Sequence, residues 1–214
     1  MEKDLAYHRK AYTKSELRAD LLTDNPMELF KNWFEEVEEI DRDSENNAMT
    51  LSSIDTDGFP HNRIVLLKKF NDDGFVFFTN YSSAKGKSIQ ENPKVSLSFF
   101  WPLLERQVIV RGNAEKLSDE GSDEYFNTRP RGSQIGAWVS HQSQPIENRE
   151  VLENRQNELE KKFENKPIPR PEFWGGFMIK PIAIEFWQGR PNRLHDRFLY
   201  ELKEGNWKVK RLAP

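Results

Sequence analysis

Short apolar segments separated by polar turns run through the middle of this sequence and restrict the folds that it can adopt. Residues 48–54, 63–70 and 75–79 form three such segments, and the turns Asp55–Gly58 and Asn71–Gly74 separate them. Apolar runs of this length, bounded by Asp, Asn and Gly, are typical of strands joined by tight turns. The pattern therefore predicts consecutive antiparallel hairpins.

Further strands and helices extend this pattern toward both ends. Apolar residues from Leu29 to Val37 recur at helical spacing after the start signal Asp24-Asn25-Pro26, which predicts an amphipathic helix to about Ile40. Helices are also expected at 82–92 and within 118–164, and strands at 95–101, 106–115, 174–179, 182–188, 198–202 and 207–212. Hairpins on both sides of the helical block, without βαβ alternation, predict a mainly β protein with flanking helices, built as an antiparallel barrel or sandwich of about eight strands.

The length of 214 residues favours a single domain over residues 23–214, preceded by a mobile, highly charged arm at residues 1–22. The 15 Phe, 6 Trp and 5 Tyr supply core material that disordered chains lack. The net charge of −3 gives no general attraction to nucleic acid, so a small anion is the better candidate ligand.

Several kinds of chemistry lack support in the composition. The sequence has no cysteine, and its four histidines are scattered, so disulfides, thiolate chemistry and a histidine-based metal site are not indicated. The first thirty residues contain neither a signal peptide nor an apolar membrane segment. We therefore expect a cytoplasmic protein that uses no metal and binds neither a membrane nor nucleic acid.

Four clusters combine cations with hydroxyl, amide or aromatic groups. They are Arg63–Lys68, Tyr125–Ser133, Trp138–Ser143 and Trp187–Arg197. Arginine forks bind phosphate bidentately, and donors at a helix start add to such a cradle, so the second cluster resembles an oxyanion site. The alternatives are a buried strand with solvated ends for the first cluster, a capped junction for the second and a solvated hairpin loop for the fourth.

The spacing within the first cluster restricts the directions in which its two cations can point. Arg63 and Lys68 are five residues apart, so an unbroken strand would point them to opposite faces unless a bulge or a strand end redirects one of them.

No arrangement of side chains suggests a reaction by itself. The sequence shows no Ser-His-Asp set, no singled-out pair of carboxylates and no GxGxxG or GxxxxGK[ST] phosphate loop. A cationic site without a protein nucleophile indicates phosphorylated ligands and an organic cofactor that carries the electron chemistry.

At these clusters the sequence resembles the pyridoxine 5′-phosphate oxidase family, from about Tyr12 to the C-terminal Arg-Leu-Ala-Pro. The similar strings are RIVLLK, LERQV, RPRGSQIGAWVSHQS, FWGGF, IEFWQG and RLHDRFLY, in the family's order and spacing. The resemblance implies a split-barrel FMN-binding fold and a homodimer that holds two FMN molecules in clefts between its subunits. It also implies oxidation of pyridoxine 5′-phosphate or pyridoxamine 5′-phosphate by molecular oxygen, which yields pyridoxal 5′-phosphate, hydrogen peroxide and, from the amine, ammonia.

The resemblance also implies roles for individual residues. The residues that match FMN contacts are Arg63, Ile64, Val65, Leu66, Leu67, Lys68, Phe78, Thr79, Lys85, Gln107, Gln142, Ser143, Trp187 and Arg197, with Arg63 and Lys85 at the FMN phosphate. The residues that match substrate contacts are Lys68, Tyr125, Arg129 and Ser133 at the substrate phosphate, and Arg9, Tyr12, Arg193, Leu194 and His195 elsewhere. Arg193 and His195 are the expected catalytic residues, which would orient the ring and stabilise charge as the 4′ oxygen or nitrogen loses its proton.

Three positions depart from the family's pattern. Phe78 replaces a common tyrosine, Ala11 replaces an acidic residue, and Ala84 replaces an arginine that commonly helps to bind the FMN phosphate. Loss of one charge-assisted contact lowers affinity by about 1.5–3 kcal/mol unless another cation, such as Lys87, replaces it.

Two other functions remain open at the level of sequence. One is oxidation of a different ring by a related flavin oxidase, such as those of phenazine biosynthesis. The other is storage or delivery of FMN or pyridoxal phosphate without catalysis, for which the same phosphate contacts would suffice.

Overall fold

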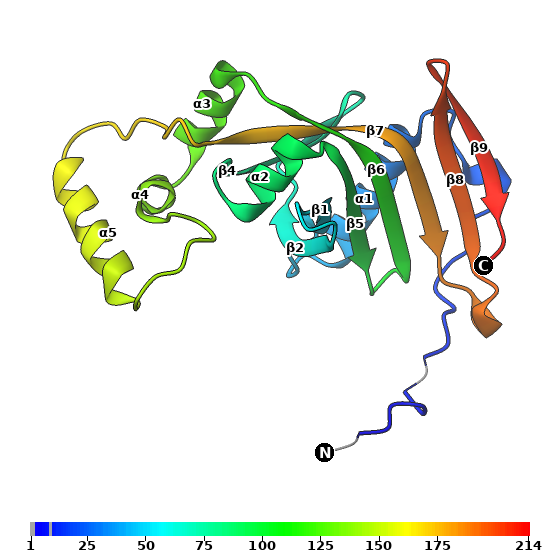
Figure 1. Cartoon of the computed structure of the whole chain (residues 1–214). Coiled ribbons are helices and arrows are strands. Elements are labelled where there is room, and N and C mark those ends of the chain that lie inside the picture. Colours follow the sequence, from blue (N-terminus) through cyan, green and yellow to red (C-terminus); the bar gives the residue numbers. More distant parts are fainter. Residues whose placement is uncertain (1–2, 9) are drawn as a thin grey trace. The chain divides into compact units, whose positions relative to one another are not determined.

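The computed structural model describes residues 3–8 and 10–214 (Figure 1). Arg9, an expected substrate contact, lies outside the described residues. The chain divides into two compact units: unit 1 comprises residues 1–50, 96–111 and 181–214, and unit 2 comprises residues 51–95 and 112–180.

Local sequence signals explain where the helices begin. The helices are η1 (Ala19–Leu21), α1 (Pro26–Ile40), α2 (Ala84–Glu91), α3 (Asp119–Thr128), α4 (Arg131–Val139), α5 (Glu150–Lys162) and η2 (Pro191–Arg193). The Asn25 side chain accepts a hydrogen bond from the Met27 N–H at the start of α1, and Ser83 and Ser118 cap α2 and α3 in a similar way. These caps satisfy N–H groups that have no partner inside the helix. They confirm the predicted starts at Asn25 and at residue 118, whereas α2 begins two residues after the start expected at residue 82.

The strands form an extensive sheet. They are β1 (Ala48–Ile54), β2 (Pro60–Leu66), β3 (Lys69–Asn71), β4 (Gly74–Asn80), β5 (Lys94–Trp101), β6 (Arg106–Lys116), β7 (Trp174–Gln188), β8 (Asp196–Lys203) and β9 (Asn206–Leu212). Their order is β2-β1-β5-β6-β7-β4-β3, with β8 paired to β7 and β9 to β8. The pairs β3–β4, β4–β7, β7–β8 and β8–β9 are antiparallel, so the predicted mainly β architecture with flanking helices is confirmed.

The expected strand over residues 63–70 is interrupted. β2 ends at Leu66, and the chain resumes as β3 at Lys69, which pairs with Val76 of β4. At the interruption Leu67 is buried, 4% exposed, while Lys68 lines a cavity. The prediction of one strand was wrong because pairing with β4, and not the local apolar run, sets the boundary. The break removes the requirement that Arg63 and Lys68 face opposite sides.

The strands expected at 174–179 and 182–188 are one strand, β7. Pro181 lies inside it, although proline has no N–H to donate to a neighbouring strand. On one side, β4 pairs with β7 as far as Ile179, and β8 pairs with it from Ala183. Pro181 therefore stands between the two partners on that side, where the missing N–H removes no hydrogen bond to either of them.

In unit 1, the apolar face of α1 packs on aromatic residues of β5 and β7. The Phe30 ring centroid lies 5.1 Å from that of Phe99, and the Trp33 ring meets Phe186 edge-on at 5.2 Å. Full burial of such side chains stabilises a fold by about 1.5–3 kcal/mol each. The helix thus fixes the C-terminal part of β7, which leads into the loop that carries the expected catalytic residues.

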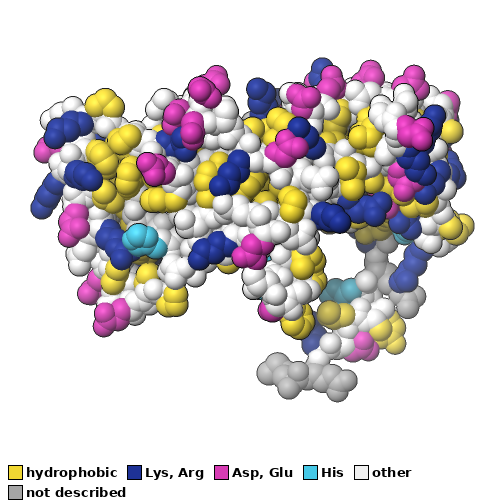
Figure 2. All heavy atoms as spheres, turned by 45° about the horizontal axis from the view of Figure 1, so that its top comes forward, with side chains coloured by type: hydrophobic (Ala, Val, Ile, Leu, Met, Phe, Trp, Pro, Cys, Tyr) yellow, Lys and Arg dark blue, Asp and Glu magenta, His cyan; other side chains and the backbone are white. Residues whose placement is uncertain are grey.

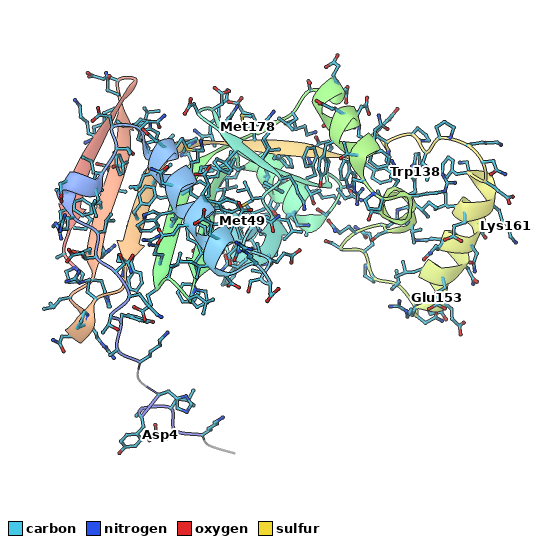
Figure 3. The ribbon with its side chains drawn as sticks, turned by 180° about the vertical axis from the view of Figure 1, so that it is seen from behind. Asp4, Met49, Trp138, Glu153, Lys161 and Met178 are labelled. Atoms are coloured by element: carbon cyan, nitrogen blue, oxygen red, sulfur yellow. The ribbon has the colours of Figure 1, made fainter. Side chains whose placement is uncertain are left out.

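In unit 2, the helices α3, α4 and α5 enclose a second apolar cluster. Its buried members are Phe126, Ile135, Val139, Phe163, Ile168 and Trp174. Trp138 of α4, labelled in Figure 3, packs at its edge and donates from Nε1 to the Pro169 carbonyl at 2.8 Å. Glu153 and Lys161 of α5 are exposed, so α5 presents its charged side to solvent (Figure 3).

The strands expected at 198–202 and 207–212 form the C-terminal hairpin. β8 and β9 are joined by Glu204 and Gly205, whose φ angles are 51° and 79°. Two successive positive φ values are typical of the two-residue turns that match the twist of a hairpin.

Charges of both signs are interspersed on the face shown in Figure 2, in keeping with the small net charge. Within the described part of the chain, every helix is too short or too polar to cross a membrane.

Candidate functional site

Unit 2 contains a cavity of about 420 Å³ between β2, β4 and the helices α2–α4. The residues that line it are Ile64, Val65, Leu66, Lys68, Phe78, Thr79, Asn80, Lys85, Tyr125, Arg129, Ser133, Gly136, Ala137, Ser140, Gln142 and Trp174. The wall combines apolar strand residues with many polar and charged side chains, so the cavity suits a small molecule that has both apolar and anionic parts.

One group of polar residues in this cavity centres on Lys85, in the first turn of α2. Lys85 Nζ donates to Gln142 Oε1 at 2.8 Å and to Thr79 Oγ1 at 3.2 Å. Burial lowers the pKa of Lys85 to about 8, and the nearby charge of Arg63 contributes. The start of a helix favours anions, so this part of the cavity suits a phosphate, which would stabilise the charged form of Lys85.

Arg63 lies next to this group without lining the cavity itself. It donates to Ser53 Oγ at 2.8 Å and to the Leu51 carbonyl at 3.3 Å. Burial lowers the pKa of Arg63, and Asp55 opposes this shift. The guanidinium is therefore held by neutral acceptors, and it adds positive potential near Lys85.

A second group of residues surrounds an aromatic stack. Phe78 and Tyr125 stack with centroids 3.9 Å apart, and Phe78 stacks on Trp174 at 5.5 Å. The Arg129 guanidinium carbon lies 4.6 Å from the Trp174 ring centroid. Among the described residues, Arg129 Nη1 is buried without a hydrogen-bond partner. Such a donor is costly to bury alone, so this end of the cavity also suits an anionic ligand.

Lys68 and Ser133 line the same cavity as Tyr125 and Arg129. Burial lowers the pKa of Arg129 and raises the pKa of Tyr125, while the Arg129 charge acts in the opposite direction on Tyr125. The break after Leu66 brings Lys68 to this wall. An ammonium group, a guanidinium and two hydroxyl groups thus line a single cavity.

Arginines outside the cavity hold α3 and α4 in place. Arg170 donates to Asp123 and Asp119 at 2.6 Å each and to the Trp174 carbonyl at 2.7 Å, which ties α3 to the start of β7. Arg131 donates to the Phe163 carbonyl at 2.6 Å. Its guanidinium contacts backbone at the end of α5, so of the two arginines in the predicted oxyanion cluster only Arg129 lines the cavity.

Unit 1 contains a second cavity of about 670 Å³. The residues that line it are His8, Lys10, Ala11, Tyr12, Arg190, Asn192, Arg193 and His195. Asn192 and Arg193 have φ angles of 58° and 63°, which non-glycine residues rarely adopt. Strained backbone of this kind is found preferentially at functional sites.

The imidazole of His195 has a defined orientation. Its Nδ1 accepts a hydrogen bond from the Arg190 N–H at 3.0 Å, and its ring lies 4.6 Å from that of Trp187. Burial lowers the pKa of His195, and the Arg193 charge lowers it further. Because Nδ1 accepts, the neutral ring carries its proton on Nε2 and presents a donor there.

The comparisons with known proteins agree along the whole chain. Residues 34–162 match the family model described as pyridoxamine 5′-phosphate oxidase, and residues 174–214 match the model of the pyridoxine 5′-phosphate oxidase C-terminal dimerisation region. A pyridoxine/pyridoxamine 5′-phosphate oxidase of Flavobacterium johnsoniae is 54% identical over 211 residues, which cover 98% of this chain and 99% of that protein. The chain belongs to the pyridoxamine 5′-phosphate oxidase family. The resemblance seen in the sequence is thereby confirmed.

Other members and solved structures support the same assignment. The pyridoxine/pyridoxamine 5′-phosphate oxidase of Rubrobacter xylanophilus is 52% identical over 212 residues, 99% of this chain and 97% of that protein. PhzG from Burkholderia lata 383, solved with tetrahydrophenazine-1-carboxylic acid, superposes with a TM-score of 0.85 at 28% identity, covering 91% of this chain and 95% of that one. A related FMN-binding protein of Nostoc punctiforme has a TM-score of 0.70 at 16% identity, covering 86% and 97%, so the predicted split-barrel fold of the family is confirmed.

The residues expected to bind FMN and substrate fall into the two units. Unit 2 brings together Ile64, Val65, Leu66, Lys68, Phe78, Thr79, Lys85, Tyr125, Arg129, Ser133 and Gln142 around its cavity. Unit 1 brings together Tyr12, Arg193 and His195 around its own cavity, and Trp187 contacts two of them.

The remaining expected residues do not line either cavity. Leu67 is in the core, Leu194 is 68% exposed, and Ser143 is exposed with a φ of 70°. Gln107 is half-buried on β6. Arg197 donates to Glu185 at 2.8 Å, an interaction that raises its pKa.

Several lining residues had no individual prediction. Trp174 stands in the FWGGF string that carries the resemblance, so a signal for it existed. Ser140 lies in the Trp138–Ser143 cluster, so a signal for it existed as well. Asn80 had none, because its place depends on a long-range hydrogen bond, at 3.4 Å, from its Nδ2 to the Ser140 carbonyl.

One group of possible metal ligands occurs in the turn after β1. Atoms of Asp55, Asp57 and His61 lie within 4.8 Å of one another. Both carboxylates already accept hydrogen bonds from N–H groups of the same turn, from Thr56 and Phe59. These contacts account for the cluster as a turn-stabilising arrangement.

Proposed function

We propose that this chain oxidises pyridoxine 5′-phosphate and pyridoxamine 5′-phosphate to pyridoxal 5′-phosphate, with FMN as its cofactor and molecular oxygen as the electron acceptor. The alcohol loses two electrons and two protons, which reduce oxygen to hydrogen peroxide. The amine loses the same number and reacts further with water, which releases ammonia. The observation that carries the proposal is the unit 2 cavity, which is lined by the three cations Lys68, Lys85 and Arg129 and so suits phosphorylated ligands.

Lys85 and the nearby Arg63 fit the phosphate of FMN. Lys85 is an ammonium group held by two neutral acceptors at the start of α2, and Arg63 lies close enough to shift its pKa. Backbone and side chains of residues 64–66 and 78–79 would line the rest of the cofactor. When bound, FMN supplies the two-electron chemistry that no side chain in this chain can provide.

Arg129 and Lys68 fit the phosphate of the substrate. Arg129 has a buried donor without a partner, and Lys68, Tyr125 and Ser133 line the same cavity. A phosphate held by such donors fixes the position of the attached ring, and positioning of this kind is a large part of catalysis. Deletion of the phosphate should therefore weaken substrate binding strongly.

Arg193 and His195 are the residues that we propose to act at the 4′ position. His195 presents a donor at Nε2, because the Arg190 N–H occupies Nδ1. Its lowered pKa keeps the ring neutral at pH 7, so it would hydrogen-bond an acceptor on the substrate and not carry a positive charge there. The Arg193 guanidinium would stabilise negative charge that develops as the 4′ group loses its proton.

We further propose that the protein works as a homodimer with FMN at the interface. The residues carried over from the family are divided between unit 1 and unit 2, and residues 174–214 match a dimerisation region. In a homodimer, the unit 1 residues of one copy and the unit 2 residues of the other could line the same site.

A second candidate function is oxidation of a reduced phenazine. The observation that favours it is the TM-score of 0.85 with PhzG from Burkholderia lata. The substrate-side cations around Arg129 argue against it, since they suit a phosphate better than a ring carboxylate alone.

Oxygen consumption by the FMN-reconstituted protein tests these possibilities together. Pyridoxine 5′-phosphate, pyridoxamine 5′-phosphate, unphosphorylated pyridoxine and a dihydrophenazine carboxylate serve as parallel substrates. We expect rapid oxygen uptake with the two phosphate esters and at least about hundredfold lower kcat/KM without the phosphate. Faster uptake with the phenazine would support the second candidate, and no uptake with any substrate would indicate a carrier.

A further inference from the structure

Glu105 is a buried carboxylate that the proposed reaction does not use. It lies in the turn between β5 and β6, is 1% exposed, and has a φ of 55°. A carboxylate out of contact with water requires hydrogen bonds or a cation, and a positive φ in a non-glycine residue requires support from its surroundings. The contacts of this residue therefore indicate what it is for.

The side chain of Glu105 holds the N-terminal segment, which we define as residues 10–14. Its Oε2 accepts the N–H groups of Thr13 at 2.8 Å and Lys14 at 3.0 Å. Lys10 Nζ lies 3.6 Å from Oε1 of the same carboxylate. Two charge-assisted hydrogen bonds and an ion pair thus fix a segment that lacks regular secondary structure.

The backbone of Glu105 holds the end of β7. Its carbonyl accepts the Gly189 N–H at 2.8 Å. Gln188 Nε2 donates to the Leu104 carbonyl at 3.0 Å and to the Glu105 carbonyl at 3.3 Å. One residue therefore joins the N-terminal segment to the strand end that precedes the Arg190–His195 loop.

Tyr12 occupies the space between these two attachments. Its ring centroid lies 5.7 Å from that of Trp187, edge-on, and 5.8 Å from that of His195. A Cβ placed on Gly189 would lie 2.8–3.0 Å from Tyr12 atoms, so the tyrosine lies directly against the backbone at this glycine. Tyr12 and His195 both line the unit 1 cavity.

We infer that Glu105 is a positioning residue that holds the N-terminal segment against Trp187 and His195, and so fixes the wall that Tyr12 contributes to the substrate site. The catalytic consequence rests on the proposed function, whereas the anchoring itself does not. Loss of the anchor frees Tyr12 to leave His195, and substrate then binds to an incomplete wall.

Three substitutions at Glu105 and one control test this inference. Glu105→Ala removes the acceptor, and Glu105→Asp shortens the side chain by one methylene, so its carboxylate falls short of both N–H groups. Glu105→Gln keeps an oxygen that can accept both hydrogen bonds. The matched control is Tyr200→Phe, which removes a buried hydrogen bond to the Thr23 carbonyl, at 2.9 Å, away from the N-terminal segment.

Limited trypsin cleavage measures the anchoring without reference to activity. In Glu105→Ala and Glu105→Asp we expect cleavage after Lys10 and Lys14 to accelerate about tenfold, because local release exposes these bonds. Cleavage after Lys161, on the exposed helix α5, serves as an internal control and should not change. Glu105→Gln and Tyr200→Phe should resemble the wild type at all three sites.

Steady-state kinetics with pyridoxine 5′-phosphate measure the catalytic consequence. Glu105→Ala and Glu105→Asp should raise KM about tenfold and change kcat by less than about threefold, and Glu105→Gln should restore KM. The inference would be overturned if Glu105→Ala were cleaved after Lys10 and Lys14 as slowly as the wild type. It would also be overturned if Tyr200→Phe raised the cleavage rate and KM as much as Glu105→Ala does. Should Glu105→Ala fail to fold, Glu105→Asp decides by the same criteria. A wild-type enzyme that oxidises no substrate would refute the proposed function, while the cleavage comparison would still decide the anchoring.

Discussion

The affinity of this protein for FMN should fall as the pH rises through the pKa of Lys85. Burial, with a contribution from Arg63, lowers that pKa from 10.5 to about 8 in the protein without ligand. The phosphate of FMN is a dianion above pH 7, since the second pKa of a phosphate monoester is about 6. Only the protonated form of Lys85 forms an ion pair with it, so deprotonation opposes binding.

The size of the effect follows from the fraction of Lys85 that is charged. With a pKa of about 8, the ammonium form makes up about nine-tenths at pH 7 and about one-tenth at pH 9. A bound phosphate raises the pKa back toward 10.5, so bound Lys85 stays charged over this range. Linkage then predicts a Kd for FMN that rises about tenfold from pH 7 to pH 9, or about 1.4 kcal/mol.

Fluorescence titration of FMN at constant ionic strength measures this dependence. Lys85→Arg keeps a charge at every pH in the range and should flatten the curve, and Lys85→Met should flatten it at a weaker affinity. Riboflavin, which lacks the phosphate, serves as the ligand control and should show no comparable rise. A wild-type Kd that stays constant from pH 7 to pH 9, or an equal slope in Lys85→Arg, would show that the charge of Lys85 does not control FMN binding.

Other substitutions test separate parts of the site and fold. Arg193→Leu should lower kcat about hundredfold while FMN remains bound, and unchanged turnover would remove its proposed role. Ala84→Arg should tighten FMN binding about tenfold by adding a charge-assisted contact, and an unchanged Kd would show that the family's arginine is not needed here. Gly86→Ala should destabilise the protein by about 1–3 kcal/mol in thermal unfolding, because its Cβ would lie 2.3 Å from the Tyr81 carbonyl oxygen. Gly132→Ala, with nothing within 4 Å of the added Cβ, is the tolerated control.

Most of the secondary structure could be predicted from signals between neighbouring residues in the sequence. Asn25, Ser83 and Ser118 cap helices through hydrogen bonds that span only two or three residues, so each start could be predicted from its own neighbourhood. The interruption at Leu67 and the continuity of β7 through Pro181 could not be predicted in this way. Both features depend on which strand pairs with the segment, and β4 and β7, which pair with each other, are distant in the sequence.

In the candidate site, too, local groups of residues could be predicted from the sequence and long-range contacts could not. The group from Tyr125 to Ser133 is local, and its cations and hydroxyls are by themselves enough to suggest an oxyanion cradle. The contact of Lys85 with Gln142 joins residues far apart in the sequence. Gln142 lay in the Trp138–Ser143 cluster, but the family resemblance alone pointed to Lys85. Glu105 stands in the LERQV string that carries the resemblance, but no role could be predicted for it, because that role depends on the N–H groups of Thr13 and Lys14, more than ninety residues earlier in the chain.

A single turnover without oxygen shows whether the phosphorylated substrate passes its electrons to the bound flavin. The FMN-loaded protein is mixed with pyridoxine 5′-phosphate under anaerobic conditions, and pyridoxal 5′-phosphate is measured against bound FMN. We expect up to one aldehyde per FMN, together with loss of the yellow flavin colour, which returns when oxygen is admitted and hydrogen peroxide forms. A yellow, substrate-binding protein that forms no pyridoxal 5′-phosphate would contradict the proposed function.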